Sequence, residues 1–141
     1  MCLKDFIVRL GIALAAGLII GFERQWHHKS AGLKTNMLVS TGSAIFVLLS
    51  IKMAVAEPTI DVTRIIAQVV TGVGFLGAGV IFREGTSVHG LTTAATIWCS
   101  AAIGCMAATG YLIETLICTV LVVFVNSFLE PLDTWLKNRK Q

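Results

Sequence analysis

Long apolar runs separated by short polar joints form the main pattern of this chain. A bilayer core about 30 Å thick requires roughly 17 to 25 apolar residues per helix, and five runs meet that length. The expected helices are Phe6–Phe22, Thr35–Ile51, Ile65–Phe82, Leu91–Thr109 and Leu112–Leu129. We therefore predict an all-α integral membrane protein, with five transmembrane helices in residues 1–130 and a short basic tail at 131–141.

The amino-acid composition is typical of a membrane protein. Of its 141 residues 55% are hydrophobic and 13% charged, and the mean hydropathy is +0.82, more apolar than a soluble domain of this size. The net charge is only +3, and the sequence has no clustered basic face interleaved with aromatic residues, which a nucleic-acid binder would need. Nucleic acid is therefore excluded as a partner. The first run carries Arg9 and leads directly into a charged joint, so we expect no cleaved signal peptide.

The distribution of basic residues predicts the orientation. Seven of the 11 Lys and Arg residues fall on one side of the expected helices and four on the other. Because cytoplasmic loops are enriched in Lys and Arg, we expect the N-terminus outside and the C-terminus in the cytoplasm.

The chain also resembles itself at an offset of 58 residues. The "GL-x-T" element beginning at Gly32 recurs at Gly90, in each case at the start of an expected helix. This indicates a parallel repeat, in which helices one and two correspond to helices three and four about an axis normal to the membrane.

Glycines concentrate in "TGVGFLGAG", Thr71 to Gly79. Three of them satisfy G-x-G-x-x-G, but they lie in the middle of an apolar run and not after a strand, which argues against nucleotide binding. We interpret them as a helix face that permits close approach of another helix, and we expect helices one and three to be in contact. The candidate packing residues are Gly17, Gly21, Gly72, Gly74, Gly77 and Gly79.

Polar side chains cluster in the two joints expected to be cytoplasmic. They are either a polar mouth between helices or ordinary anchors whose side chains extend to the headgroups. Thr92 or Thr93 is also suited to capping the fourth helix. We expect the two joints to close over one another as a polar vestibule. The candidates are Glu23, Arg24, Gln25, Lys34, Thr35, Arg83, Glu84, Thr92 and Thr93.

The opposite side offers Asp61, Arg64 and Gln68 near the start of helix three. Asp61 is placed to cap that helix, and Asp5 with Arg9 forms an i, i+4 pair on helix one. Structural pairing and an outward-facing cation or ligand site both remain open.

Sequence gives little support for catalysis or a metal. His27 and His28 are adjacent and point about 100° apart on a helix, so they would need a distant partner such as His89 to bind a metal. Because no catalytic constellation appears, we expect a protein that is not an enzyme and has no cofactor.

Three segments resemble the MgtC/SapB family of bacterial inner-membrane proteins. They are "GFERQ" with "AGLKT", "DVTRIIAQVVTGVGFLGAGVI", and "GLTTAATIWCSAAIG". The resemblance implies five helices with the N-terminus outside, and a role in growth under magnesium limitation, stress adaptation or virulence. Some members inhibit the proton-translocating ATP synthase. Lys34 departs from a more typical Arg, and many members continue into a soluble ACT-like domain that we expect to be absent here.

Two functions compete. One is a non-enzymatic protein that binds or modulates another membrane component, as a homodimer or other homo-oligomer or with a partner such as an ATP synthase or transporter subunit. The other is a small channel or transporter for a cation or small solute.

Overall fold

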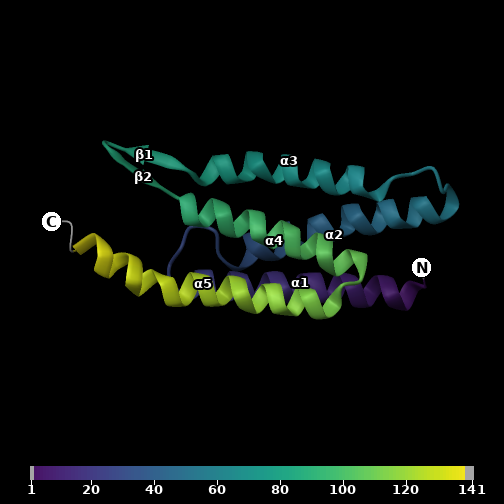
Figure 1. Cartoon of the computed structure of the whole chain (residues 1–141), viewed down its shortest axis with the longest axis horizontal. Coiled ribbons are helices and arrows are strands. Elements are labelled where there is room, and N and C mark those ends of the chain that lie inside the picture. The colour runs from purple at the N-terminus through teal and green to yellow at the C-terminus, as the bar shows by residue number, and fades with distance from the viewer. Residues whose placement is uncertain (1, 139–141) are drawn as a thin grey trace.

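The computed structural model describes the backbone of residues 2–138 and the side chains of residues 2–129. Its elements in chain order are α1 (Leu3–Trp26), α2 (Leu33–Ala56), α3 (Val62–Val80), β1 (Phe82–Glu84), β2 (Ser87–His89), α4 (Leu91–Thr109) and α5 (Leu112–Asn138). In this part of the chain five helices are long and apolar enough to cross a membrane, as predicted. Figure 1 shows them running side by side along the long axis of the molecule.

The ends of the helices differ from those expected. Both α1 and α2 are longer at each end, and α3 ends at Val80 because Ile81 takes an extended backbone. The helical backbone of α5 continues through Asn138, so it includes most of the expected tail, and residues 139–141 lie outside the described residues.

Helices α2 and α4 form the centre of the bundle. α2 packs chiefly on α1 and α4, α3 packs on α4 and α2, and α5 packs on α1 and α4. The expected contact between helices one and three is therefore wrong for the described chain: α1 and α3 lie on different sides of the α2–α4 pair.

Three glycines permit close backbone approach in this centre. A Cβ added at Gly17 would lie 2.7 Å from the carbonyl oxygen of Asn36, and one at Gly21 would lie 2.7 Å from the Cα of Leu33. A Cβ at Gly104 would collide with the backbone of Ser40. Small residues therefore join α1 to α2 and α2 to α4, as expected where lipid supplies no hydrophobic drive for helix association.

The glycines of α3 are placed differently. A Cβ at Gly77 would make ordinary contact with Ala94 at 3.6 Å, whereas Gly72, Gly74 and Gly79 have no atom within 4 Å of the added position. Most of the dense glycine segment thus lies on parts of α3 that the rest of the described chain leaves open, with Gly72 and Gly79 on one face.

The joint between α3 and α4 is not the simple loop that was expected. Phe82–Glu84 and Ser87–His89 pair as an antiparallel hairpin, with Gly85 at φ +60 in its two-residue turn. Gly90 follows at φ +87, and a Cβ there would collide with the backbone of Val80. This glycine lets the chain leave the hairpin and enter α4 at once.

The two halves of the expected repeat share one structural feature. Gly32 and Gly90 each occupy the position before a helix, but their φ angles are −94° and +87°, so the two helix starts are not equivalent. The repeat and the orientation in the membrane stay predictions.

A polar string crosses the interior between α2 and α4. Asn36 is fully buried, donates to the carbonyl oxygens of Ala31 and Gly32 at 2.9 and 3.0 Å, and accepts from Ser100 at 2.8 Å. Ser40 donates to the carbonyl of Ala13 at 2.7 Å. These bonds satisfy polar groups that would be costly to leave unpaired in an apolar interior.

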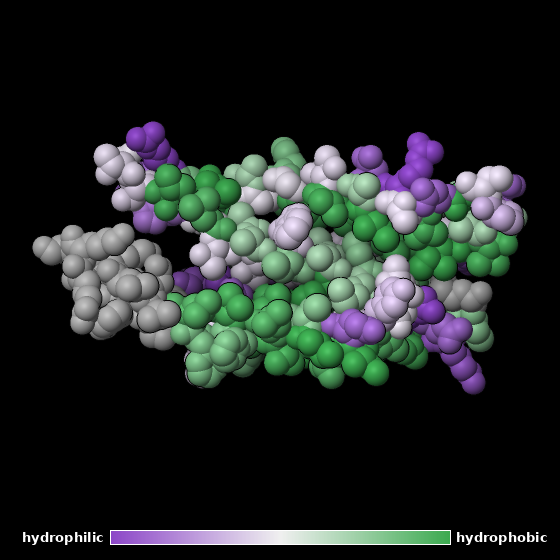
Figure 2. Space-filling view, viewed as in Figure 1, coloured by the Kyte–Doolittle hydropathy of each residue, from purple (hydrophilic) through white to green (hydrophobic). Residues whose placement is uncertain are grey.

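The outside of the bundle is apolar. Figure 2 shows hydrophobic side chains over much of the middle of this view and hydrophilic ones gathered toward its ends. That distribution suits a protein whose middle lies in hydrocarbon.

Candidate functional site at one end of the bundle

A cavity of about 630 Å³ opens where the hairpin, the α1–α2 joint, α4 and α5 meet. Residues from both polar joints line it, which agrees with the expected vestibule. The residues lining it are Arg24, His28, Lys29, Ser30, Phe82, Val88, His89, Gly90, Leu91, Thr92, Thr93, Val125, Asn126 and Leu129.

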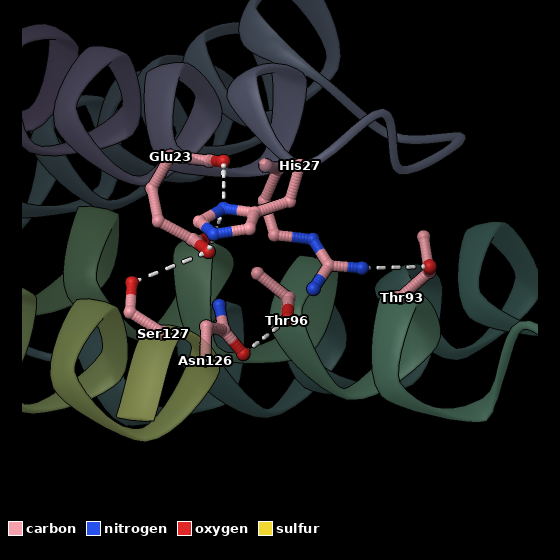
Figure 3. Close-up of polar contacts among 7 residues, drawn as sticks. Glu23, His27, Thr93, Thr96, Asn126 and Ser127 are labelled. Atoms are coloured by element: carbon pink, nitrogen blue, oxygen red, sulfur yellow. Dashed lines mark hydrogen bonds and ion pairs between the residues drawn. The ribbon is translucent and has the colours of Figure 1, made fainter. Parts of the chain in front are cut away.

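Arg24 is the most deeply buried charged residue of this cavity. It lies in the last turn of α1, is only 2% exposed, and donates from Nη2 to the Thr93 hydroxyl at 2.9 Å. Figure 3 shows this bond joining α1 to the first turn of α4. The expected cap of α4 by Thr92 or Thr93 is wrong: the N-cap residue is Gly90, and the helix begins without a side-chain cap bond.

Glu23 lies beside Arg24 but makes separate contacts. Its Oε1 is 3.1 Å from His27 Nδ1, one turn later on α1, and accepts from Ser127 of α5 at 3.5 Å. Its Oε2 is buried and has no hydrogen-bond partner among the described residues. The arrangement links α1 to α5 (Figure 3) and leaves one carboxylate oxygen with spare acceptor capacity.

Asn126 completes the polar wall from α5. It is 9% exposed, and its Oδ1 accepts from the Thr96 hydroxyl at 3.3 Å. Its Nδ2 is buried and has no hydrogen-bond partner in the described part of the chain. A buried amide donor without a partner is unusual and is a common mark of a ligand or water site.

The other candidates of the α1–α2 joint lie at the end of α1 and at the start of α2. Gln25 accepts from the backbone N–H of Leu33 at 3.2 Å, which supplies a side-chain partner for the first residue of α2. Lys34 and Thr35 are exposed and do not line the cavity.

Arg83 and Glu84 are exposed on β1 and also do not line the cavity. The Arg83 Nε donates to the carbonyl of Gly85 at 2.9 Å, across the turn of the hairpin.

The remaining candidates lie far from this cavity, at or toward the other end of α3. Asp61 caps α3 as predicted, accepting from the Thr63 amide at 2.8 Å and the Thr63 hydroxyl at 2.7 Å. These two bonds, chiefly the side-chain one, hold the pKa of Asp61 below its usual value, with Arg64 contributing less. Gln68 lines a separate groove between α2 and α3.

The expected Asp5–Arg9 pairing is replaced by other bonds. Asp5 accepts from the backbone N–H of Cys2 at 3.3 Å, and Arg9 donates to the carbonyl of Ala108 at 2.8 Å. Arg9 therefore donates a hydrogen bond to the C-terminal end of α4.

Sequence reasoning missed the interior and α5 members of these networks. The signal was present, since Asn36, Ser100 and Asn126 are polar residues within apolar runs, where an unpaired polar group is expensive. Among the described residues, no three His, Cys, Asp or Glu side chains are grouped so that they could hold a metal ion.

Fold and cavity together define a multi-pass helical membrane protein with a polar cavity at one end of its bundle. The MgtC family model matches residues 10–135, and the chain belongs to this family. No solved structure matches the chain.

Curated relatives agree with this assignment. The chain is 48% identical to Protein MgtC of Brucella abortus over 120 residues, covering 85% of this chain and 49% of that protein. It is 46% identical to Protein MgtC of Salmonella typhimurium over 130 residues, covering 92% and 54%. An uncharacterized protein of Synechocystis is 43% identical over 136 residues, covering 96% and 57%. The chain thus spans about half the length of the relatives it matches.

Proposed function

We propose that this protein is a non-enzymatic member of the MgtC family that acts by binding another membrane component through the open face of α3. The setting implied by the family resemblance is adaptation to low magnesium or intracellular stress, in the bacterial inner membrane. The N-terminus lies outside and the end that carries the cavity faces the cytoplasm. In support of that orientation, the α1–α2 joint and the hairpin lie at the same end of the molecule as the basic end of α5.

The low burial of α3 carries the proposal. Of its 19 residues only Val73 and Gly77 are buried, whereas α4, of equal length, has ten buried residues. Gly72 and Gly79, seven residues apart and therefore on one face of α3, leave side-chain-free positions there. A face of this kind suits close contact with a second transmembrane helix, because packing replaces hydrophobicity as the drive for association in lipid.

A groove beside α3 extends the same surface. It has a volume of about 560 Å³, and residues of α2 and α3 line it. Its wall is mostly apolar, with Ser43 and Gln68 as polar members. The expected occupant is a transmembrane helix, from a second copy of this chain or from a partner such as an ATP synthase or transporter subunit.

Photo-crosslinking tests the proposal. A photoreactive residue at Phe75, which is 82% exposed on α3, should give a discrete product in native membranes that mass spectrometry identifies. The same residue at Ile113 of α5, 73% exposed, is the matched lipid-facing control and should give none. Gly72→Leu, which fills the open face that Phe75 shares, should abolish the product, whereas Gly11→Leu, at an equally open glycine of α1, should not.

Transport is the alternative outcome. Purified protein in liposomes should carry no flux of magnesium, protons or phosphate under imposed gradients. A robust flux that Asp61→Asn abolishes, together with equal labelling from Phe75 and Ile113, would replace the binding proposal with a channel or transporter.

A further inference from the structure

We infer that the cavity beside Arg24 is a binding site for a phosphate group, carried by an anionic lipid headgroup or by a soluble phosphate. This site is distinct from the α3 face, and the inference stands whether or not that face binds a partner.

The charge of the cavity selects an anion. Among its described lining residues, the ionisable ones are Arg24, His28, Lys29 and His89, and each is cationic or can become so. Arg24 is buried to 2% exposure and already has its Nη2 directed to Thr93, which fixes one edge of the guanidinium. Hydrogen bonds from a guanidinium to phosphate oxygens are charge-assisted and therefore strong.

The start of α4 adds positive electrostatic potential to the cavity. Gly90 stands before a helix of 19 residues that begins without a side-chain cap bond, and Thr92 and Thr93 of its first turn line the cavity. The positive end of the helix dipole and the first-turn N–H groups therefore lie at the cavity wall, an arrangement that favours anions.

A separate observation points to a ligand. Asn126 reaches the cavity from α5, is 9% exposed, and has an Nδ2 donor without a partner among the described residues. A buried donor without an acceptor has lost its hydrogen bonds to water and is unfavourable. An oxygen-rich ligand would supply the missing acceptor.

Size and wall chemistry agree with a phosphate ester. A volume of about 630 Å³ lies within the usual range of ligand cavities, roughly 300 to 1,000 Å³, and far exceeds a bare phosphate. The polar end formed by Arg24, Thr93 and Asn126 is accompanied by apolar residues. These are Phe82, Val88, Leu91, Val125 and Leu129. The site also lies at the end of the helices, at the depth of lipid headgroups.

The test uses the full chain in detergent micelles at constant ionic strength. Thermal unfolding is followed during titration with inorganic phosphate, with short-chain phosphatidic acid, and with short-chain phosphatidylcholine as the zwitterionic control. Saturable stabilisation by phosphatidic acid alone assigns the site to a lipid headgroup. Saturable stabilisation by inorganic phosphate as well assigns it to the phosphate group itself.

Variants locate the binding. Arg24→Gln should weaken it at least tenfold, and Lys29→Gln and His89→Gln should each weaken it several-fold. Arg64→Gln, which removes a cation at the opposite end of α3, should leave it unchanged. Because Arg24→Gln removes a buried bond that contributes to folding, the exposed His89→Gln substitution keeps the test decisive. Absence of saturable binding in the wild type, or unchanged binding in Lys29→Gln and His89→Gln, overturns the inference.

Discussion

Gly104 of α4 faces the backbone of Ser40 in α2 so closely that a Cβ added to the glycine would lie 2.8 Å from the Ser40 carbonyl carbon. The obstacle is backbone, which has no rotamer to change. The contact therefore sets the distance between the two central helices, and the hydrogen bond from Ser40 to Ala13 fixes α2 against α1 at the same level.

Gly104→Ala should destabilise the bundle. Overpacking of a filled interior costs about 1 to 3 kcal/mol, more than the 0.5 to 1 kcal/mol that Ala gains over Gly inside a helix. Unfolding by SDS titration in mixed micelles, followed by circular dichroism, measures the change. Gly11→Ala is the control: nothing lies within 4 Å of that position, so it should be neutral or slightly stabilising. Equal stability of the two variants would contradict the packing described.

Asn36 should be energetically coupled to Ser100. Asn36→Ala removes the acceptor of the Ser100 hydroxyl and the donor to Ala31 and Gly32, so it should cost more than Ser100→Ala. A double-mutant cycle measured by the same SDS titration should give a coupling of about 0.5 to 2 kcal/mol, the range of hydrogen bonds between membrane helices.

Ser50→Ala is the matched control for that cycle. Ser50 is also a buried helix serine, but its hydroxyl has no hydrogen-bond partner among the described residues, so its removal should not destabilise the protein. A coupling of zero between Asn36 and Ser100 would show that their contact contributes no stability.

Arg9 should stabilise the joint between α4 and α5. The Arg9 guanidinium donates to the Ala108 carbonyl at 2.8 Å. Gly110, at φ +96, makes space for the guanidinium, because a Cβ added to Gly110 would lie only 3.0 Å from Arg9 Nη2. A hydrogen bond from a charged donor is worth about 1.5 to 3 kcal/mol. The positive charge of Arg9 also interacts favourably with the negative end of the α4 dipole.

Thermal unfolding should therefore rank variants of these residues in a specific order of melting temperature. Arg9→Gln should lower the melting temperature, whereas Lys4→Gln, an exposed cation on the same helix, should not. Asp5→Asn should also leave the Arg9 bond intact, because Asp5 bonds to Cys2. A loss in Asp5→Asn as large as in Arg9→Gln would instead favour the i, i+4 pair expected from sequence.

Sequence predicted the five helices because an apolar run of membrane length has few alternatives to a helix. It also predicted the Asp61 cap and the meeting of the two polar joints, since both depend on residues near one another in the chain or at helix ends. The partners of individual side chains were less predictable. Arg24 was expected among the polar residues of the first joint, but its bond to Thr93 joins residues 69 positions apart, and the pattern does not specify how the helix of Thr93 is rotated about its axis.

The glycines illustrate the same limit. Composition marks Gly17 and Gly74 equally as positions of close approach, yet only Gly17 meets another helix within the described chain. Which face of an apolar helix turns inward depends on the packing of all five, and a chain with apolar residues on every face carries little periodic signal of it. The β-hairpin was missed because three-residue strands joined by two residues are too short for an alternating pattern.

Asp61 should remain ionised to unusually low pH. The Thr63 hydroxyl and amide donate to its carboxylate and, with a smaller effect of Arg64, lower its pKa below the ordinary value of 3.8. A carboxyl with a lowered folded-state pKa contributes stability above its unfolded-state pKa, and that contribution is lost as the pH falls through the folded-state value. The cap should therefore hold at neutral pH and weaken only in acid below about 3.8.

The titration can be followed directly by ¹³C NMR of selectively labelled aspartate in micelles. Thr63→Val removes the hydroxyl, the largest cause of the shift, but keeps the amide, so it should raise the Asp61 pKa part of the way to its ordinary value. Arg64→Gln should raise it less, because the charge of Arg64 is the smaller influence. An unchanged pKa in Thr63→Val would remove the hydroxyl from the cap. With the cap intact, Asp61 is a fixed negative charge near neutral pH, which suits anchoring the start of α3 and does not suit the reversible protonation that a proton-coupled transporter requires.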